Sequence, residues 1–209
     1  MAAIGGYRGQ GRSYKTLFLS RNRLMPYSAA LIRKVRAHIG DDGIIAYAAE
    51  SCYGLGCDPR NARAVRRLLK LKSRPQSKGL ILIADRYSRL RRYVLPPTAE
   101  QSRPLDQTWP GPHTWLMPAS RLTPRWLRGQ HESIAVRVTA HPDAAELCRA
   151  LGTALVSTSA NYVGMRPLKT YAACVKAFGQ SVLVLPGRVG IRKAPSTIQN
   201  LLTGTIIRP

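Results

Sequence analysis

The chain has 209 residues, enough for one domain whose hydrophobic core needs no disulfide scaffold. Apolar residues make up 44% of it, which argues against wholesale disorder, and the longest apolar run, Gly79 to Ala84, is too short for a transmembrane helix. The 33 Lys and Arg against 10 Asp and Glu give a net charge of +23. So basic a chain attracts phosphate-bearing partners, although a generally arginine-rich proteome would give the same excess.

The first 24 residues differ from the rest of the chain. They hold five bases, four glycines and no acid, a composition that predicts a disordered basic tail. We expect the folded domain to span residues 25–209. Two explanations of the tail remain open: Met25 is the true start, or the segment is an arm that binds nucleic acid.

The first part of the domain predicts helices that alternate with strands. Ser28 can cap a helix that Gly40 ends, and Asn61 can start a second helix. In that second helix, Val65, Leu68 and Leu69 share the inward face. The expected elements are helix 29–39, strand 43–47, a helix from residue 61 and strand 79–84.

The second part continues the alternation, which is typical of an α/β fold. Thr170 can cap the last helix. We expect a turn at 109–112, strands at 113–117, 133–138, 154–156 and 181–185, and helices at 142–151 and 171–178. The strands near 113–118 and 133–138 have no good helix between them, so part of the sheet should be antiparallel. The prediction is a single-domain α/β fold with a twisted mixed parallel/antiparallel sheet flanked by helices.

Several common sites are absent from the sequence. The four cysteines form no C-x-x-C pair and have no histidine at metal-ligand spacing, so we expect reduced thiols in a cytoplasmic protein and no metal site. Neither a Walker phosphate loop nor a G-x-G-x-x-G dinucleotide motif is present. A nucleotide would therefore bind in a less common cradle.

Three polar clusters could carry chemistry. In Lys72-Ser73-Arg74-Pro75, the proline favours an extended Arg74, which would direct Lys72 and Arg74 to one side, with Lys78 nearby. Residues 156–161 gather Ser157, Ser159 and Asn161 as the chain leaves a strand, where open α/β sheets bind ligands. Each cluster taken alone also fits an ordinary polar turn. In the third cluster, after strand 43–47, Glu50 either pairs structurally or handles a substrate ammonium or a metal.

Together these segments resemble the YrdC/TsaC family, the bacterial threonylcarbamoyl-AMP synthases, in their short form without an added C-terminal domain. The matching segments follow the family order over about residues 26–209, and their spacing makes the set specific. They are residues 47–58, the K-x-R motif 72–74 running into 78–84, Trp109-Pro-Gly-Pro112, residues 133–137, the S-x-N motif 159–161, residues 195–198 and Arg208.

The resemblance implies a reaction that joins L-threonine, bicarbonate and ATP into threonylcarbamoyl-AMP and pyrophosphate. Partner proteins would then transfer the group to A37 of tRNAs that read ANN codons. It implies Lys72 and Arg74 as catalytic residues, ATP as a substrate that brings Mg²⁺, and no permanently bound cofactor. The implied ATP contacts are Lys72, Arg74, Lys78, Ser133, Ser159, Asn161 and Arg208; the implied threonine contacts are position 49, Arg137, Ser157 and Ser196.

The chain departs from the family at one place. The family usually has Tyr-Pro-Thr-Glu where this chain has Tyr47-Ala48-Ala49-Glu50. Ala49 lacks a hydroxyl that would bind the amino acid, so we expect weaker threonine binding and an unchanged ATP site. Two alternatives stay open: a catalytically impaired RNA-binding or ribosome-maturation module of the same fold, supported by the +23 charge, and a carbamoyl-transfer domain like that of hydrogenase maturation proteins.

Overall fold

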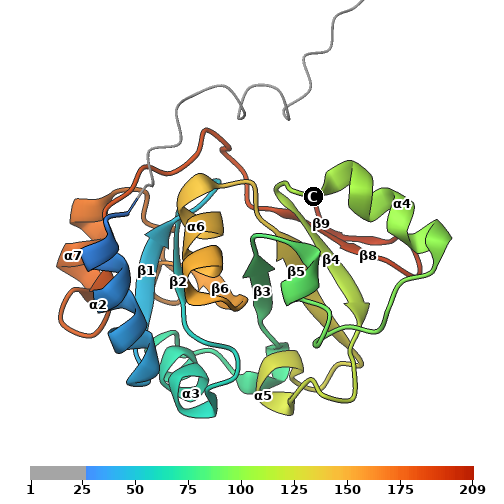
Figure 1. Ribbon diagram of the computed structural model, residues 1–209, viewed down its shortest axis with the longest axis horizontal. Coiled ribbons are helices and arrows are strands. Elements are labelled where there is room, and N and C mark those ends of the chain that lie inside the picture. The colour runs from blue at the N-terminus through green and yellow to red at the C-terminus, as the bar shows by residue number, and fades with distance from the viewer. Residues whose placement is uncertain (1–26) are drawn as a thin grey trace, which may run out of the picture.

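The computed structural model describes residues 27–209, which build one nine-stranded mixed sheet with flanking helices (Figure 1). The expected basic tail, residues 1–24, lies outside the described residues. The strand order is β7-β1-β2-β6-β3-β5-β4-β8-β9. The pairs β1–β7, β3–β5 and β4–β8 are parallel and the other neighbours are antiparallel, so the predicted mixed sheet is confirmed.

The described elements have the following bounds. The strands are β1 Ile45–Ala48, β2 Tyr53–Gly56, β3 Ile81–Ala84, β4 His113–Pro118, β5 Ser133–Val138, β6 Leu155–Ser159, β7 Leu183–Val184, β8 Thr197–Asn200 and β9 Ile206–Arg208. The α-helices are α2 Ala29–Gly40, α3 Ala62–Leu71, α4 Ala99–Thr108, α5 Arg125–Arg128, α6 Pro142–Leu151 and α7 Tyr171–Phe178. Two short 3₁₀ turns, η1 Gln76–Lys78 and η2 Tyr87–Arg89, follow α3 and β3. No helix within residues 27–209 is long and apolar enough to cross a bilayer.

The predicted helix caps are present. The Ser28 hydroxyl accepts the Leu31 N–H at 3.2 Å, the Asn61 side chain accepts two N–H groups at the start of α3, and Thr170 caps α7. Strand 133–138 and helices 142–151 and 171–178 have the predicted ends. Several predicted ends were wrong: strand 43–47 lies at Ile45–Ala48, strand 79–84 begins at Ile81, strand 154–156 lies at Leu155–Ser159, and strand 181–185 shortens to Leu183–Val184. The segment after Ala48, for which no second strand was predicted, returns as β2.

One face of the sheet is covered along its central strands. Leu55, Leu82, Val136 and Val156 point to this face and are fully buried in the larger apolar cluster. The inward residues of α3 lie in the same cluster, as the helical spacing predicted.

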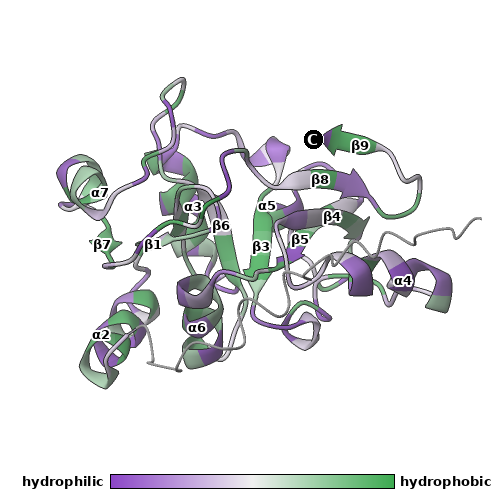
Figure 2. Ribbon diagram, turned by 90° about the horizontal axis from the view of Figure 1, so that it is seen from above, coloured by the Kyte–Doolittle hydropathy of each residue, from purple (hydrophilic) through white to green (hydrophobic). Residues whose placement is uncertain are grey.

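The opposite face is covered only in part. In its covered half, defined here by Ile45, Tyr47, Ile83 and Leu155, the side chains pack with apolar residues of α2 and α6. Figure 2 shows α2 and α6 side by side below this part of the sheet and away from β8 and β9. The remaining residues of that face form its open half, which includes Ile81, Ser133, Ala135, Arg137 and Ser157.

Candidate active site

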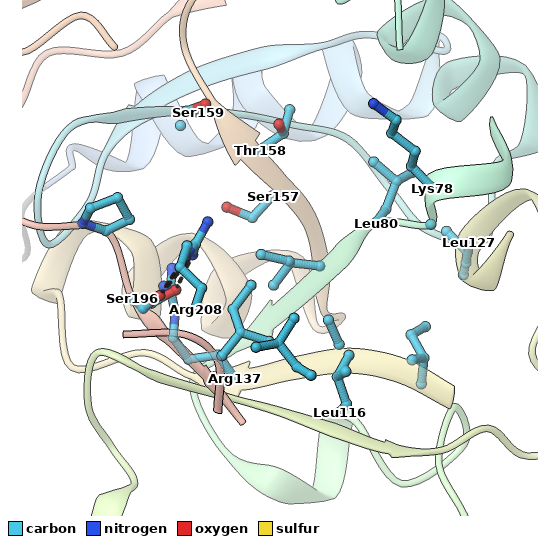
Figure 3. A pocket seen from close by; sticks show the side chains of 18 of the residues that line it. Lys78, Leu80, Leu116, Leu127, Arg137, Ser157, Thr158, Ser159, Ser196 and Arg208 are labelled. Atoms are coloured by element: carbon cyan, nitrogen blue, oxygen red, sulfur yellow. Dashed lines mark hydrogen bonds between the residues drawn. The ribbon is translucent and has the colours of Figure 1, made fainter. Parts of the chain in front are cut away.

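A pocket of about 460 Å³ lies on the open half of the sheet (Figure 3). Its floor is set by strand register: Ile81 pairs with Ser157 on one side and with Ala135 on the other, and Ala135 pairs with Leu116. Because residues directly opposite each other on paired strands point to the same face of a sheet, these four side chains point into the same space. The floor is therefore apolar at Ile81, Ala135 and Leu116 and becomes polar at Ser157.

The walls of the pocket are strongly basic. Arg74, Lys78, Arg128, Arg137 and Arg208 all line it, and none of the described lining residues is Asp or Glu. Unbalanced positive charge around a concave surface concentrates anions. The pocket can therefore hold a polyanion such as a nucleoside triphosphate.

Most residues singled out in the sequence meet here. The pocket is lined by Arg74, Lys78, Ser133, Arg137, Ser157, Ser159, Ser196 and Arg208, which come from distant parts of the chain. Lys72, Asn161 and Ala49 are not among its lining residues.

Lys72 lies behind the pocket wall. Its ammonium donates to the Ser159 carbonyl at 2.8 Å, to Asn161 Oδ1 at 2.7 Å and to the Asn161 carbonyl. The Ser159 hydroxyl also donates to Asn161 Oδ1, at 2.7 Å. Lys72 thus ties the S-x-N segment to the end of α3. Burial, and secondarily the charge of Arg74, lowers the pKa of Lys72 to about 8.

The extended path expected from Lys72 to Arg74 is wrong at Lys72 and Ser73. Lys72 caps α3 in a helical conformation, and Ser73 has a φ of 44°, in the left-handed region. The turn at the end of α3 thus lies at Lys72 and Ser73, before the Arg74 that precedes Pro75. Arg74 lines the pocket because its guanidinium is anchored to the Gly79 carbonyl at 2.8 Å and 3.2 Å.

Arg208 and Ser196 form a second anchored unit. The Arg208 guanidinium donates to the Ser196 carbonyl at 2.7 Å and 3.0 Å and to the Ser196 hydroxyl at 3.0 Å, and Thr114 donates to the same hydroxyl at 3.0 Å. Figure 3 shows Arg208 next to Arg137. Burial first, and then the charges of Arg137 and Arg192, lowers the pKa of Arg208. These arginines are held together despite their repulsion.

Glu50 pairs with Arg137. Arg137 Nη2 lies 3.3 Å from Glu50 Oε2, and the Thr139 hydroxyl donates to Glu50 Oε1 at 2.6 Å. Burial alone would raise the pKa of the Glu50 carboxyl, but Arg137, Thr139 and further partners outweigh it and lower that pKa. Of the two roles left open in the sequence, the structure supports the structural pairing.

Ser157 and Ser159 lie within β6. The prediction that they follow the strand end is wrong, because β6 pairs with β2 on one side and with β3 on the other through these residues. The Tyr47 hydroxyl donates to Ser157 Oγ at 2.9 Å. Gly54, opposite Ser159, leaves room for this contact: a Cβ there would lie 3.3 Å from the Tyr47 ring and 3.5 Å from Ser157 Oγ.

Ala49 lies just past β1 and is buried beside the covered half. Its N–H donates to the Cys52 carbonyl at 3.1 Å, and its carbonyl accepts the Gly190 N–H at 2.9 Å. Its methyl group belongs to the apolar cluster that includes Tyr47. Its role in binding the amino acid stays a prediction.

Sequence reasoning missed several residues of the site. Arg128 and His131 line the pocket from the segment around α5, and Thr114 and Thr139 orient its side chains. None of them belongs to a local motif, so their place depends on the sheet register and on how α5 packs. Cys52, Cys57, Cys148 and Cys174 are free thiols, and no group of three His, Cys, Asp or Glu in residues 27–209 could hold a metal ion.

Comparison with known sequences places this site in a family. The profile of the Sua5_yciO_yrdC family, described as telomere recombination, matches residues 37–209. The threonylcarbamoyl-AMP synthase of Methylobacillus flagellatus is 56% identical over 177 residues, covering 85% of this chain and 98% of that protein. The protein of the same name from Chromobacterium violaceum is 56% identical over 178 residues, covering 85% and 92%.

Solved structures of other proteins have the same fold as this chain. Sua5 of P. abyssi in complex with L-threonine superposes with a TM-score of 0.79 at 26% identity, over 85% of this chain and 53% of that one. This chain thus spans about half of that protein. E. coli YciO, at 24% identity and a TM-score of 0.75 over 86% and 88% of the two chains, shares the fold. By the profile match and the identity to the curated relatives, the chain belongs to the Sua5–YciO–YrdC family.

Proposed function

We propose that this protein is a threonylcarbamoyl-AMP synthase, a nucleotidyltransferase that joins L-threonine, bicarbonate and ATP. The observation that carries the proposal is the pocket with five cationic side chains and no carboxylate among its described lining residues, in a chain 56% identical to proteins of that name. The products are threonylcarbamoyl-AMP, pyrophosphate and water.

The proposed chemistry needs positioning and charge more than a covalent nucleophile. The threonine amine and bicarbonate form a carbamate with loss of water. A carbamate oxygen then attacks the α-phosphorus of ATP, and the bond to pyrophosphate breaks. Negative charge develops on the phosphate oxygens and on the leaving pyrophosphate, and preorganised cations and N–H donors lower that barrier.

We assign the triphosphate to the wall that bears Arg74 and Lys78. Ser133, Ser159 and Arg208 line the same pocket; the Ser133 hydroxyl and the Arg208 guanidinium can donate to the phosphates, whereas the Ser159 hydroxyl donates to Asn161 Oδ1. Lys72 and Asn161 act from behind this wall, because Lys72 binds the Ser159 carbonyl and Asn161 accepts the Ser159 hydroxyl. This assignment gives Arg74 the direct catalytic role and makes Lys72 a positioning residue.

We assign the amino acid to the opposite side, near Arg137. A guanidinium that lines the pocket is suited to a carboxylate, which it binds through paired N–H donors. Ser157 and Ser196 are the nearby hydroxyls, and position 49 lies next to this part of the sheet without lining the pocket.

Other substrates and partners belong to the same proposal. Mg²⁺ enters with ATP as part of the substrate, and the enzyme works in the cytoplasm. Its product is passed to proteins that transfer the threonylcarbamoyl group to tRNA. The +23 charge would favour contact with tRNA during this transfer.

The test is pyrophosphate release from ATP, with each substrate left out in turn. A synthase requires both threonine and bicarbonate, and mass spectrometry should detect threonylcarbamoyl-AMP. Release without threonine, or no release with the full set, would contradict the proposal. The impaired RNA-binding alternative is not favoured, because the cationic lining of the pocket is present in full.

A further inference from the structure

A buried carboxylate lies directly behind the basic pocket. The Glu50 side chain is 12% exposed and the Arg137 side chain 10% exposed, and the pair joins the end of β1 to β5. Glu50 itself does not line the pocket, whereas Arg137 does. Any effect of the Glu50 side chain on a bound ligand is therefore indirect, and Arg137 is the pocket residue that this side chain contacts.

Glu50 is fixed from two directions. Its carboxylate accepts the Thr139 hydroxyl at 2.6 Å, and its backbone carbonyl accepts the Arg192 N–H at 3.2 Å. Arg192 belongs to the segment that leads into Ser196, the partner of Arg208. The same residue thus contacts Arg137 through its side chain and the Ser196 segment through its backbone.

Arg137 needs such a partner. It lies close enough to Arg208 for the two charges to repel, and unpaired burial of a guanidinium is costly. The contact with Glu50 uses Nη2, and the buried Nε has no hydrogen-bond partner within residues 27–209. Because Arg137 lines the pocket and Glu50 is its one charged side-chain partner among the described residues, the guanidinium keeps donors free for an anion.

We propose that Glu50 is a positioning residue that holds the Arg137 guanidinium in the orientation that binds the carboxylate of the amino-acid substrate. This inference rests on the proposed function, and it adds a residue that selects the substrate without touching it. Removing the Glu50 charge should release Arg137 from its fixed orientation and weaken binding of the amino acid. Binding of ATP should change little, because Arg74 is anchored to the Gly79 carbonyl and not to Glu50.

The main test is Glu50→Gln, which keeps the shape and removes the charge. The matched control is Glu146→Gln: Glu146 is also a buried carboxylate paired with an arginine, Arg149, but it lies on α6 outside the pocket lining. We expect Glu50→Gln to raise the KM for threonine about tenfold or more, with the KM for ATP within about twofold of wild type. The control should leave both KM values unchanged.

A second pair of variants covers the case that Glu50→Gln does not fold. Thr139→Val removes the hydroxyl that holds Glu50, and Thr139→Ser keeps it. Thr139→Val should raise the KM for threonine, and Thr139→Ser should have a KM for threonine close to that of wild type. A thermal melt that falls while both KM values stay unchanged, or KM values that rise together, would overturn the proposal.

Direct binding separates this inference from the proposed function. Calorimetry with L-threonine and with L-threoninol, which lacks the carboxylate, needs no turnover. Glu50→Gln should weaken binding of threonine and leave the weaker binding of threoninol unchanged. Normal threonine binding by Arg137→Ala would overturn the inference, whereas a wild-type protein that binds threonine and releases no pyrophosphate would overturn the proposed function alone.

Discussion

The covered half and the open half of one sheet face are built from the same strands. In β3, Ile83 lies under α6 and Ile81 lies in the pocket; in β6, Leu155 lies under α6 and Ser157 lies in the pocket. Side chains two residues apart point the same way, so the difference comes from what covers them. Where α6 ends, apolar burial gives way to polar groups and fixed cations.

The comparison shows how stability and chemistry are separated on one surface. Side chains of the covered half are closed off from solvent and contribute to the free energy of folding. The cations around the open half are anchored by hydrogen bonds to backbone carbonyls, as Arg74 and Arg208 are. Substitutions in the covered half should therefore lower stability, and substitutions in the open half should mainly weaken binding or turnover.

The largest expected effect is on stability, in the covered half. Leu155→Ala removes a fully buried side chain and should lower the free energy of unfolding by about 2–5 kcal/mol. Ser157→Ala, two residues on, removes the acceptor of the buried Tyr47 hydroxyl, so it should cost less stability, about 1–3 kcal/mol, and should also weaken binding of the amino acid. Denaturant unfolding and steady-state kinetics of both variants test this, and equal effects on stability would remove the distinction.

Arg74→Ala should have the largest effect on turnover. Loss of one preorganised charge near the phosphates should lower ATP turnover by about 100-fold, with stability close to wild type. Arg103→Ala, an exposed arginine on α4 outside the pocket lining, is the control for loss of charge. Near wild-type turnover of Arg74→Ala would refute the assignment of the phosphate wall.

Lys72 should make stability depend on pH in the alkaline range. Its folded pKa of about 8 lies below the ordinary value of 10.5, so between these two pH values the unfolded chain binds more protons and stability rises with pH. We expect wild type to gain about 1–3 kcal/mol relative to Lys72→Met across this window. If the free energy of unfolding had the same pH dependence in both proteins from pH 7 to 10.5, the lowered pKa of Lys72 would be contradicted.

The smallest expected effect concerns Ala49, at the border of the two halves. Ala49→Thr should tighten threonine binding by about 0.5–1.5 kcal/mol and leave ATP binding unchanged, because it restores one hydroxyl. Calorimetry measures both affinities, and an unfolding curve checks that the buried position accepts the larger side chain. Weaker threonine binding in a stable variant would show that this position does not face the substrate.

Local signals in the sequence were sufficient for much of the fold. Ser28, Asn61 and Thr170 cap helices through contacts within three residues, so their effect is visible in any short window. Strand β5 and helix α6 have clear periodicity and were predicted with the right ends. Four α-helices and strands gave no such signal: β2 contains Gly54 and Gly56, β8 is largely polar with no buried residue, α4 buries only Leu105 and contains Pro104, and α5 is only four residues long.

The sequence by itself determined which residues could form the site and the local elements that carry most of them. Only the tertiary structure decided their arrangement: Lys72 behind the wall, Arg128 in it, and Glu50 paired with Arg137 across 87 positions of the chain. The physical reason is the separation along the chain of the residues that interact. Caps and periodicity act between near neighbours, whereas these contacts depend on strand register and helix packing, which the whole core sets at once.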